Sequence, residues 1–217
     1  MKISPDAVPP AFDALLCDLD GVVRFYDHTE VNRLEQAAGL AEGSTMRVAF
    51  APHNDLPLLL GRISRQQWAE AIACDLVEAG LTPSQAQDLG GAFVTVPSRV
   101  DPTVVDLLRQ ARERCTLVLV TNATTWLDED LAQLGVADLA DHVVNSSRVG
   151  IAKPDPRIYR IAAERAAAPA ERCLFVDDRQ ENIDAARSCG MSGLLFREPA
   201  DLRAALYPLI GDERHSA

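Results

Sequence analysis

Hydrophobic residues along this chain gather in short continuous runs rather than at alternating positions. The clearest runs lie at residues 14–17, 116–120, 173–176 and 193–196, and a weaker one lies at 142–144. Strands that are covered on both faces have this pattern, because neither face meets water. The runs therefore predict the buried strands of a mainly parallel sheet.

Segments with helical spacing of apolar residues separate these runs. They cover residues 101–114, 126–134, 156–167 and 182–189. A glycine follows the second and the fourth segment, as is common where a helix ends. Strands that alternate with helices indicate a doubly wound, Rossmann-like α/β core.

Residues 27–97 interrupt this alternation. They contain three stretches of helical character, at 31–40, 64–79 and 83–93, and Ser64 with Gln67 matches the capping-box pattern. We therefore expect a small helical domain inserted after the first strand. The expected boundaries are residues 25–97 for the insert and residues 1–24 and 98–217 for the core.

Composition limits the possible partners. The 217 residues are 47% hydrophobic, which suits a buried core, and they carry a formal net charge of -11. Nucleic acids and anionic membranes attract cationic proteins through counterion release, so neither is an expected partner. No apolar stretch has transmembrane length and the N-terminus lacks an apolar signal segment, so a cytoplasmic location is expected.

The cysteines give no sign of a disulfide framework or a zinc site. Their number is odd and no pair has a C-x-x-C spacing. We expect small buried side chains in a reducing compartment. The cysteines are Cys17, Cys74, Cys115, Cys173 and Cys189.

The first candidate site follows the first apolar run. Asp18 and Asp20 stand two positions apart, so their carboxylates can point the same way, and Gly21 permits a sharp turn beside them. The carboxyl end of a parallel strand is where open α/β sheets bind ligands. Two carboxylates this close repel each other, and a divalent cation relieves the repulsion. An Asp-rich solvated turn is the alternative interpretation.

Two further segments offer phosphate-binding groups. Thr121 and Asn122 follow the second run with a hydroxyl, an amide and backbone N–H groups. An ordinary helix N-cap would also explain them. Lys153 lies just before a helix whose start is marked by Pro156, and its ammonium could neutralise a phosphoryl group and a carboxylate together.

The fourth segment joins these to a second pair of acids. Asp177 and Asp178 end the third apolar run, and Asn182 stands where the next helix is expected to begin, in a capping position. Neighbouring strand residues face opposite sides, so only one of the two acids is expected to meet the first aspartates directly. Acids at the end of a buried strand are costly unless a cation matches them.

Taken together, these four segments resemble the motifs of the haloacid dehalogenase superfamily, in its phosphatase branch. The resemblance covers roughly residues 12–24 and 98–197 and implies a helical cap for the insert. By this resemblance Asp18 is the nucleophile that forms an aspartyl-phosphate, and Asp20 is the general acid and base. The residues flanking Asp178 look most like sugar-phosphate phosphatases and the phosphatase domain of epoxide hydrolases.

The resemblance also implies a cofactor and a set of binding residues. Mg²⁺ is the implied metal, with Asp18, Asp178 and the backbone carbonyl of Asp20 as its ligands. Thr121 and Lys153 match the family's phosphate-binding residues, and Lys153 is also expected to be catalytic. Asn122 is a further candidate for phosphate binding, and Asp177 and Asn182 are expected to support the site. The expected partner is a small phosphorylated substrate, such as a sugar phosphate, and the chain is expected to be a monomer or a homodimer.

Two other functions compete with this one. A metal-independent 2-haloacid dehalogenase would keep Asp18 but generally lacks the second aspartate, whereas Asp20 is present here. A catalytically silent phosphate-binding regulatory module would be expected to lose a carboxylate or Lys153, and none is lost.

The insert contains polar and aromatic residues that could contact a substrate, and the sequence does not rank them. Arg24 and Phe25, which lead into it, depart from the residues common in the family. The candidates are Arg33, Arg47, His53, Asn54, Arg62, Arg65 and Trp68.

Overall fold

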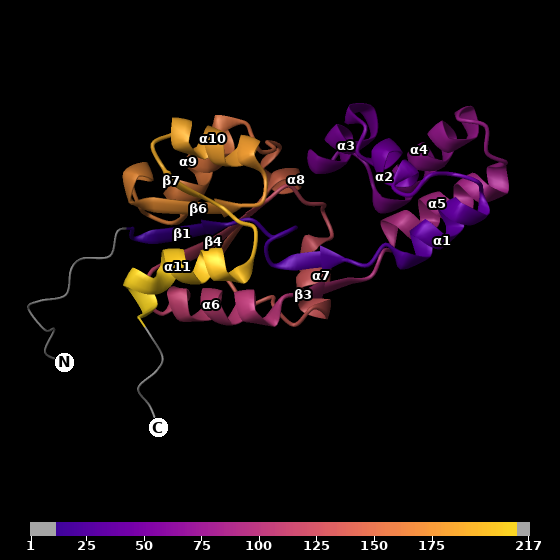
Figure 1. Ribbon diagram of the computed structural model, residues 1–217. Coiled ribbons are helices and arrows are strands. Elements are labelled where there is room, and N and C mark those ends of the chain that lie inside the picture. Colours follow the sequence, from indigo (N-terminus) through magenta and orange to yellow (C-terminus); the bar gives the residue numbers. More distant parts are fainter. Residues whose placement is uncertain (1–11, 212–217) are drawn as a thin grey trace, which may run out of the picture.

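The computed structural model describes residues 12–211. Figure 1 shows two bodies side by side, an α/β core and a smaller group of helices. We call the group formed by residues 29–94 the helical unit.

A five-stranded parallel sheet forms the centre of the core, in the order β5-β4-β1-β6-β7. β1 is the central strand, since it pairs with β4 on one side and β6 on the other. All four of its residues are therefore fully buried. The five strands coincide with the five apolar runs, so the predicted α/β fold class is confirmed. Their bounds are β1 Ala14–Cys17, β4 Thr116–Thr121, β5 His142–Asn145, β6 Cys173–Asp177 and β7 Ser192–Leu195.

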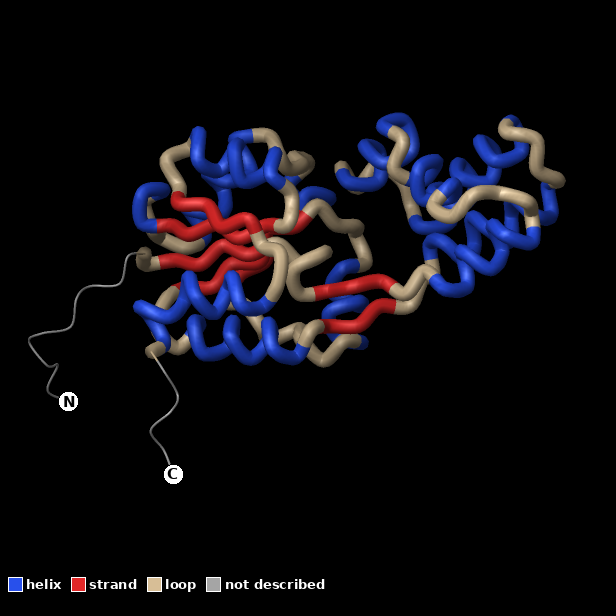
Figure 2. Tube along the Cα trace, in the orientation of Figure 1, coloured by secondary structure: helices blue, strands red, loops and turns tan. Residues whose placement is uncertain are grey.

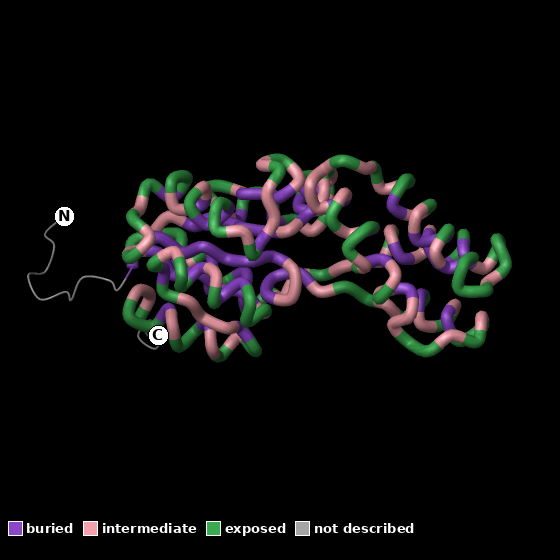
Figure 3. The backbone as a smooth tube through the Cα atoms, turned by 90° about the horizontal axis from the view of Figure 1, so that it is seen from above, coloured by how far each residue is buried: buried purple, intermediate pink, exposed green. Residues whose placement is uncertain are grey.

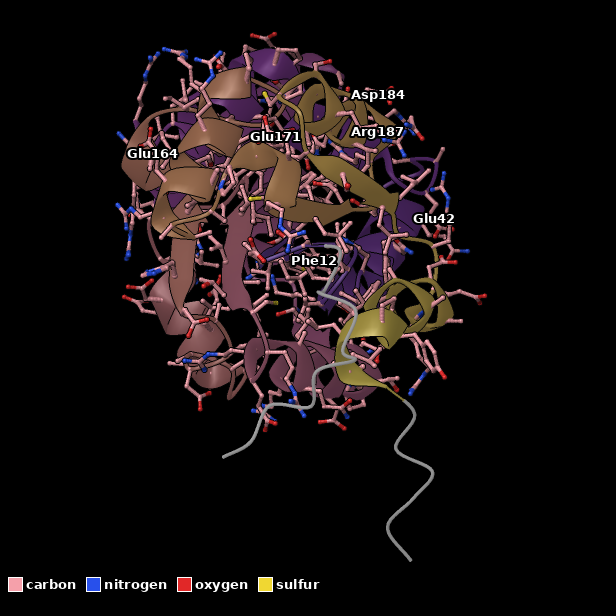
Figure 4. The ribbon with its side chains drawn as sticks, turned by 90° about the vertical axis from the view of Figure 1, so that its left-hand side faces the viewer. Phe12, Glu42, Glu164, Glu171, Asp184 and Arg187 are labelled. Atoms are coloured by element: carbon pink, nitrogen blue, oxygen red, sulfur yellow. The ribbon has the colours of Figure 1, made fainter. Side chains whose placement is uncertain are left out.

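Helices cover both faces of this sheet (Figure 2). One face packs on α6 and α11 around residues such as Leu108 and Leu202, and the other packs on α9 and α10 around Tyr159 and Ile183. Figure 4 views the core from the end opposite the helical unit, with Glu164 of α9 and Asp184 of α10 on one layer. The core helices are α6 Pro102–Arg112, α7 Leu127–Gln133, α8 Ser146–Val149, α9 Pro156–Arg165, η1 Ala170–Arg172 (3-10), α10 Gln180–Ser188 and α11 Pro199–Ile210.

The helical unit has a hydrophobic cluster of its own, which is visible in Figure 3 as buried positions separate from those of the core. α4 and α5 pack closely because Gly90 has no side chain: a Cβ there would lie 2.6 Å from the carbonyl oxygen of Ala69. The helices are α1 Thr29–Ala37, α2 Ser44–Ala49, α3 Pro52–Leu59, α4 Arg65–Glu78 and α5 Pro83–Val94. The capping box at Ser64 and Gln67 is present at the start of α4.

A two-stranded antiparallel ribbon joins the two bodies. β2 (Arg24–Tyr26) leads into the helical unit and β3 (Ser98–Val100) returns from it. The hydrogen bond from Asp27 N to Pro97 O continues this pairing by one step, at 2.8 Å. Strands of three residues leave no apolar pattern, which is why the sequence did not predict them.

The structure differs from the sequence expectations at several other places. α2, α3, α8 and α11 were not predicted. Asn182 does not cap α10, because the helix begins at Gln180 and Asn182 lies inside its first turn. Of the cysteines, Cys17 and Cys173 are buried as expected, but Cys74 is exposed. Among the described helices, none has the length and apolar character needed to cross a membrane.

Candidate active site

The predicted site residues meet at the carboxyl edge of the sheet. Asp18 directly follows β1, Thr121 is the last residue of β4 and Asp177 is the last residue of β6. Because β1 lies between β4 and β6, these three side chains come from neighbouring strand ends. All three residues are buried, with Asp18 only 6% exposed.

Lys153 lies at the centre of this group. Its Nζ is 2.8 Å from Asp18 Oδ1 and 2.7 Å from Asp177 Oδ2, and its side chain is 1% exposed. Burial alone would lower the pKa of Lys153, but the two carboxylates reverse this and hold it above its ordinary value. The ammonium is therefore a fixed positive charge between two acids.

Asp177 is held in place on all sides. Besides Lys153, it accepts hydrogen bonds from the backbone N–H of Arg179 at 2.8 Å and from the Asn182 amide at 3.0 Å. Asn182 thus binds Asp177 from inside the helix instead of capping it. These contacts agree with a supporting role for Asp177 and Asn182, and that role stays a prediction.

Asp178 completes an acidic cluster. One carboxylate oxygen from each of Asp18, Asp177 and Asp178 lies within 4.8 Å of the others. Both acids of the fourth segment therefore approach Asp18, although their alternation on a strand suggested that only one would. The turn at Gly21, with φ of +82°, makes this possible, because a Cβ there would overlap the Asp178 carboxylate.

The charges of this cluster do not balance. Three carboxylates face one ammonium, which leaves an excess of negative charge in a largely buried place. Burial raises the pKa of Asp18 above its ordinary range, with Lys153 acting in the opposite direction. Burial, followed by the nearby Asp177, also raises the pKa of Asp178. A divalent cation with oxygen ligands fits this donor set, and Mg²⁺ prefers such ligands.

Thr121 and Asn122 have different surroundings. Thr121 Oγ1 is buried and has no hydrogen-bond partner among residues 12–211. The Asn122 side chain instead bonds the backbone of Lys153, accepting from its N–H at 2.7 Å and donating to its carbonyl at 2.9 Å. Asn122 therefore positions Lys153, while Thr121 has an unused hydroxyl for a ligand.

Asp20 stands apart from the acidic cluster and is bound by Arg24. Arg24 Nε donates to Asp20 Oδ1 at 2.6 Å and Nη2 donates to Oδ2 at 3.0 Å. The third guanidinium nitrogen donates to Asp130 of α7 at 3.1 Å. In the sequence, Arg24 stood out only because it differs from the residue common in the family. The pattern of apolar and polar residues does not predict its contact with Asp130.

A cavity of about 810 Å³ between the core and the helical unit contains Asp18, Asp20, Thr121, Lys153 and Asp178 in its lining. Several lining residues were not anticipated from the sequence. They are Tyr26, His28, Phe50, Asp55, Phe93, Trp126, Asp130 and Arg179.

Of the substrate-contact candidates in the insert, Arg65 and Trp68 line this cavity. The others do not. Arg33 pairs with Glu30, and His53 and Asn54 both bind Asp75.

A comparison with known protein families identifies the family of this chain. The model for haloacid dehalogenase-like hydrolases matches residues 12–190. The chain belongs to the haloacid dehalogenase-like hydrolases. The predicted superfamily is confirmed, and the protein is an enzyme of this hydrolase family.

Curated members of the family include several phosphatases. The chain is 34% identical over 147 residues to phosphoserine phosphatase of Thermus thermophilus, covering 64% of this chain and 59% of that protein. It is 28% identical to Phosphatase MT3486 of Mycobacterium tuberculosis, covering 89% of this chain and 91% of that protein. It is 32% identical to bifunctional epoxide hydrolase 2 of Rattus norvegicus and spans only 38% of its length.

Solved structures of haloacid dehalogenase-like proteins share the fold. A family enzyme from Bacteroides thetaiotaomicron, in complex with magnesium and inorganic phosphate, has a TM-score of 0.66 at 18% identity, covering 94% of this chain and 98% of that one. L-2-haloacid dehalogenase from Xanthobacter autotrophicus has a TM-score of 0.62 at 21% identity, covering 93% and 85%. Phosphate-binding and dehalogenating proteins therefore share this architecture, and the fold alone does not separate them.

Proposed function

We propose that this hydrolase is a Mg²⁺-dependent phosphomonoesterase that acts on a small phosphorylated metabolite. The observation that carries the proposal is the cluster of three carboxylates, two of them paired with Lys153, together with the unpartnered hydroxyl of Thr121. Such a site has groups for a cation and for phosphoryl oxygens at once. Phosphatase-named relatives support the same conclusion.

Asp18 is the proposed nucleophile. Its Oδ1 accepts a hydrogen bond from the backbone N–H of Leu19 at 2.7 Å in addition to the Lys153 contact, which fixes the direction of the carboxylate. Attack on phosphorus forms an aspartyl-phosphate and breaks the bond to the leaving oxygen. Lys153 then faces the added negative charge of the phosphoryl group, and Thr121 Oγ1 donates to one of its oxygens.

Asp20 is the proposed acid and base. It lines the same cavity as Asp18, and Arg24 fixes both of its oxygens. Its proton goes to the leaving oxygen in the first step, and it takes a proton from the attacking water in the second. Hydrolysis of the aspartyl-phosphate releases inorganic phosphate and restores Asp18.

The proposed ligands of Mg²⁺ are Asp18, Asp178 and the backbone carbonyl of Asp20, and Asp177 is close enough to take part. When bound, the ion supplies positive charge to the carboxylates and to the phosphoryl oxygens. The helical unit, together with the flanking residues of 25–97, is the proposed cap. It excludes water from the site and contacts the leaving group.

The test measures phosphate release from p-nitrophenyl phosphate with and without Mg²⁺. Turnover in wild type is expected to need Mg²⁺ and to fall by about 10⁴-fold or more in Asp18→Asn. Asp106→Asn, an exposed acid on α6, is the matched control and should retain wild-type turnover.

The two competing functions give different results in the same experiment. Chloride release from 2-chloropropionate without metal would identify a dehalogenase. Phosphate binding without turnover of any ester would identify a regulatory module.

A further inference from the structure

Aromatic side chains line the part of the cavity that belongs to the helical unit and its ribbon. Tyr26, His28, Phe50, Trp68 and Phe93 all contribute to the lining. Their rings form a continuous series, with centroid separations of 6.2 Å for Tyr26–His28 and 5.8 Å for both His28–Phe93 and Phe93–Phe50. We call these five residues the aromatic wall.

The aromatic wall has a buried support and an exposed face. Trp68 and Phe93 are 8% and 5% exposed and pack edge to face at 5.6 Å, so they belong to the hydrophobic cluster of the helical unit. Phe50 and Tyr26 are 52% and 43% exposed. Because Phe50 packs on both buried rings, its own ring is held in place while much of its surface stays open.

The same cavity holds the phosphate site. Asp18, Thr121 and Lys153 line it together with the aromatic wall. A volume of about 810 Å³ is within the range of small-molecule sites and exceeds what a phosphoryl group needs. A phosphate ester bound at Asp18 therefore has its leaving group in the space that the wall borders.

Polar side chains also line this cavity, among them Asp55, Ser98, Gln133 and Arg179, and some polar groups near the wall already have protein partners. Arg65, the cation that the helical unit contributes, lies 4.6 Å over the Trp126 ring and 3.6 Å from Asp130. Thr95, which directly follows α5, donates from its Oγ1 to the carbonyl of Gly91 in that helix at 2.8 Å. The wall itself presents mainly ring surface, and its own polar groups are the Tyr26 hydroxyl and the His28 imidazole, whose buried Nδ1 has no hydrogen-bond partner among residues 12–211.

We propose that the natural substrate is the phosphate ester of an alcohol that carries a planar aromatic or heteroaromatic ring, and that this ring packs against the aromatic wall. The inference rests on the proposed phosphatase function and departs from the sugar phosphate that the sequence resemblance indicated. The reaction consumes one water, breaks the bond between phosphorus and the ester oxygen, and releases the aromatic alcohol and inorganic phosphate.

The test compares benzyl phosphate with cyclohexylmethyl phosphate, and both with glycerol 3-phosphate. The first two esters have apolar groups of similar size and leaving oxygens of similar basicity, so they differ mainly in aromaticity. We expect kcat/KM for benzyl phosphate to exceed that for cyclohexylmethyl phosphate by about tenfold, the scale of ring contacts beyond burial. Phe50→Leu should bring the two values together. Tyr207→Leu, an exposed ring on α11 outside the cavity, should keep the wild-type ratio.

A binding measurement separates this inference from the proposed function. The chain has two tryptophans, Trp68 and Trp126, and both line the cavity. Their fluorescence should report benzylphosphonate, which cannot be hydrolysed, at about tenfold lower concentration than cyclohexylmethylphosphonate. Equal values for the matched pair, or a preference for glycerol 3-phosphate, would overturn the inference and leave the phosphatase standing. If no ester is hydrolysed, the proposed phosphatase function is wrong. Binding of the two phosphonates would still test whether the aromatic wall prefers an aromatic ring.

Discussion

Arg24 binds both carboxylate oxygens of Asp20, with its Nε 2.6 Å from Oδ1 and its Nη2 3.0 Å from Oδ2. The guanidinium is almost fully buried, at 4% side-chain exposure, and it also binds Asp130. Asp130 lies 3.6 Å from Arg65 of the helical unit. The proposed acid is therefore connected through two arginines and one aspartate to the part of the protein that covers the site.

Arg24→Met is expected to reduce turnover of glycerol 3-phosphate by about 100-fold, because the proposed acid loses the two hydrogen bonds that orient it. Turnover of p-nitrophenyl phosphate should fall much less, since its leaving group departs without a proton. Steady-state kinetics with both esters measures the difference. Arg33→Met, on the outer face of α1, is the control. An equal loss with the two esters would mean that Arg24 only supports the fold.

Gly21→Ala is expected to weaken Mg²⁺ binding by tenfold or more. A Cβ at this position would lie 2.7 Å from Asp178 Cγ, so the carboxylate must leave the cluster. Gly39→Ala is a matched control, because Gly39 has a similar φ of +75° and no atom within 4 Å of the added Cβ. Both variants should lose about 1–2 kcal/mol of stability from the left-handed backbone.

Calorimetric titration with MgCl₂ distinguishes the two glycine variants. Only Gly21→Ala should lose affinity for the ion. If both variants bind Mg²⁺ as wild type does, Asp178 is not a ligand.

Replacement by alanine is expected to change the stability of the protein in opposite directions at two adjacent glycines of α5. Gly90→Ala places a Cβ against the backbone of Ala69 and should destabilise the protein by about 1–3 kcal/mol. Gly91→Ala meets nothing within 4 Å and should stabilise it by about 0.5–1 kcal/mol, because alanine has the higher helix propensity. Urea unfolding monitored by circular dichroism measures both changes. A loss of stability in both variants would contradict the close packing of α4 on α5.

Asp55 is expected to make stability depend on pH. Burial raises the pKa of this cavity-lining carboxyl to about 6, with Arg179 acting in the opposite direction. The folded state therefore binds a proton more tightly than the unfolded state, and stability is lost as pH rises from about 4 through 6. Asp55→Asn removes this loss, so the variant should be more stable than wild type at pH 8 by about 1 kcal/mol, after allowance for solvent screening.

Urea unfolding at pH 4.5 and pH 8 tests this expectation. The gain of Asp55→Asn should shrink toward zero at the lower pH. Asp106→Asn serves as the exposed control and should show no such change. A gain of equal size at both pH values would rule out titration of Asp55 as its cause.

The strands and the edge of the sheet that carries the site could be predicted from the order of residues alone. Parallel strands buried on both faces need continuous apolar runs, and polar residues must follow where the chain leaves the sheet. Asp18, Thr121 and Asp177 were placed together for that reason. Lys153 was a candidate as a cation before a helix, but its sequence position alone does not reveal that it contacts Asp18 and Asp177.

The three-dimensional arrangement decided which partners those residues have. Asn122 bonds the backbone of Lys153, 31 positions away, and Asn182 bonds Asp177 from within a helix that was expected to begin at Asn182. Arg24 reaches Asp130 across 106 positions. Periodicity records which face of an element is buried, but it does not record how far a side chain extends or where a later loop returns.

For this protein the sequence by itself determined the α/β class, the strand ends that carry the acids, and the family. Only the tertiary structure decided that Asp178 joins Asp18 and Asp177 in one cluster, and that aromatic side chains from four separate segments form one wall of the cavity. The reason is physical: burial along a strand or helix is a local property of the chain, whereas a site between two bodies depends on packing between residues that are distant in sequence.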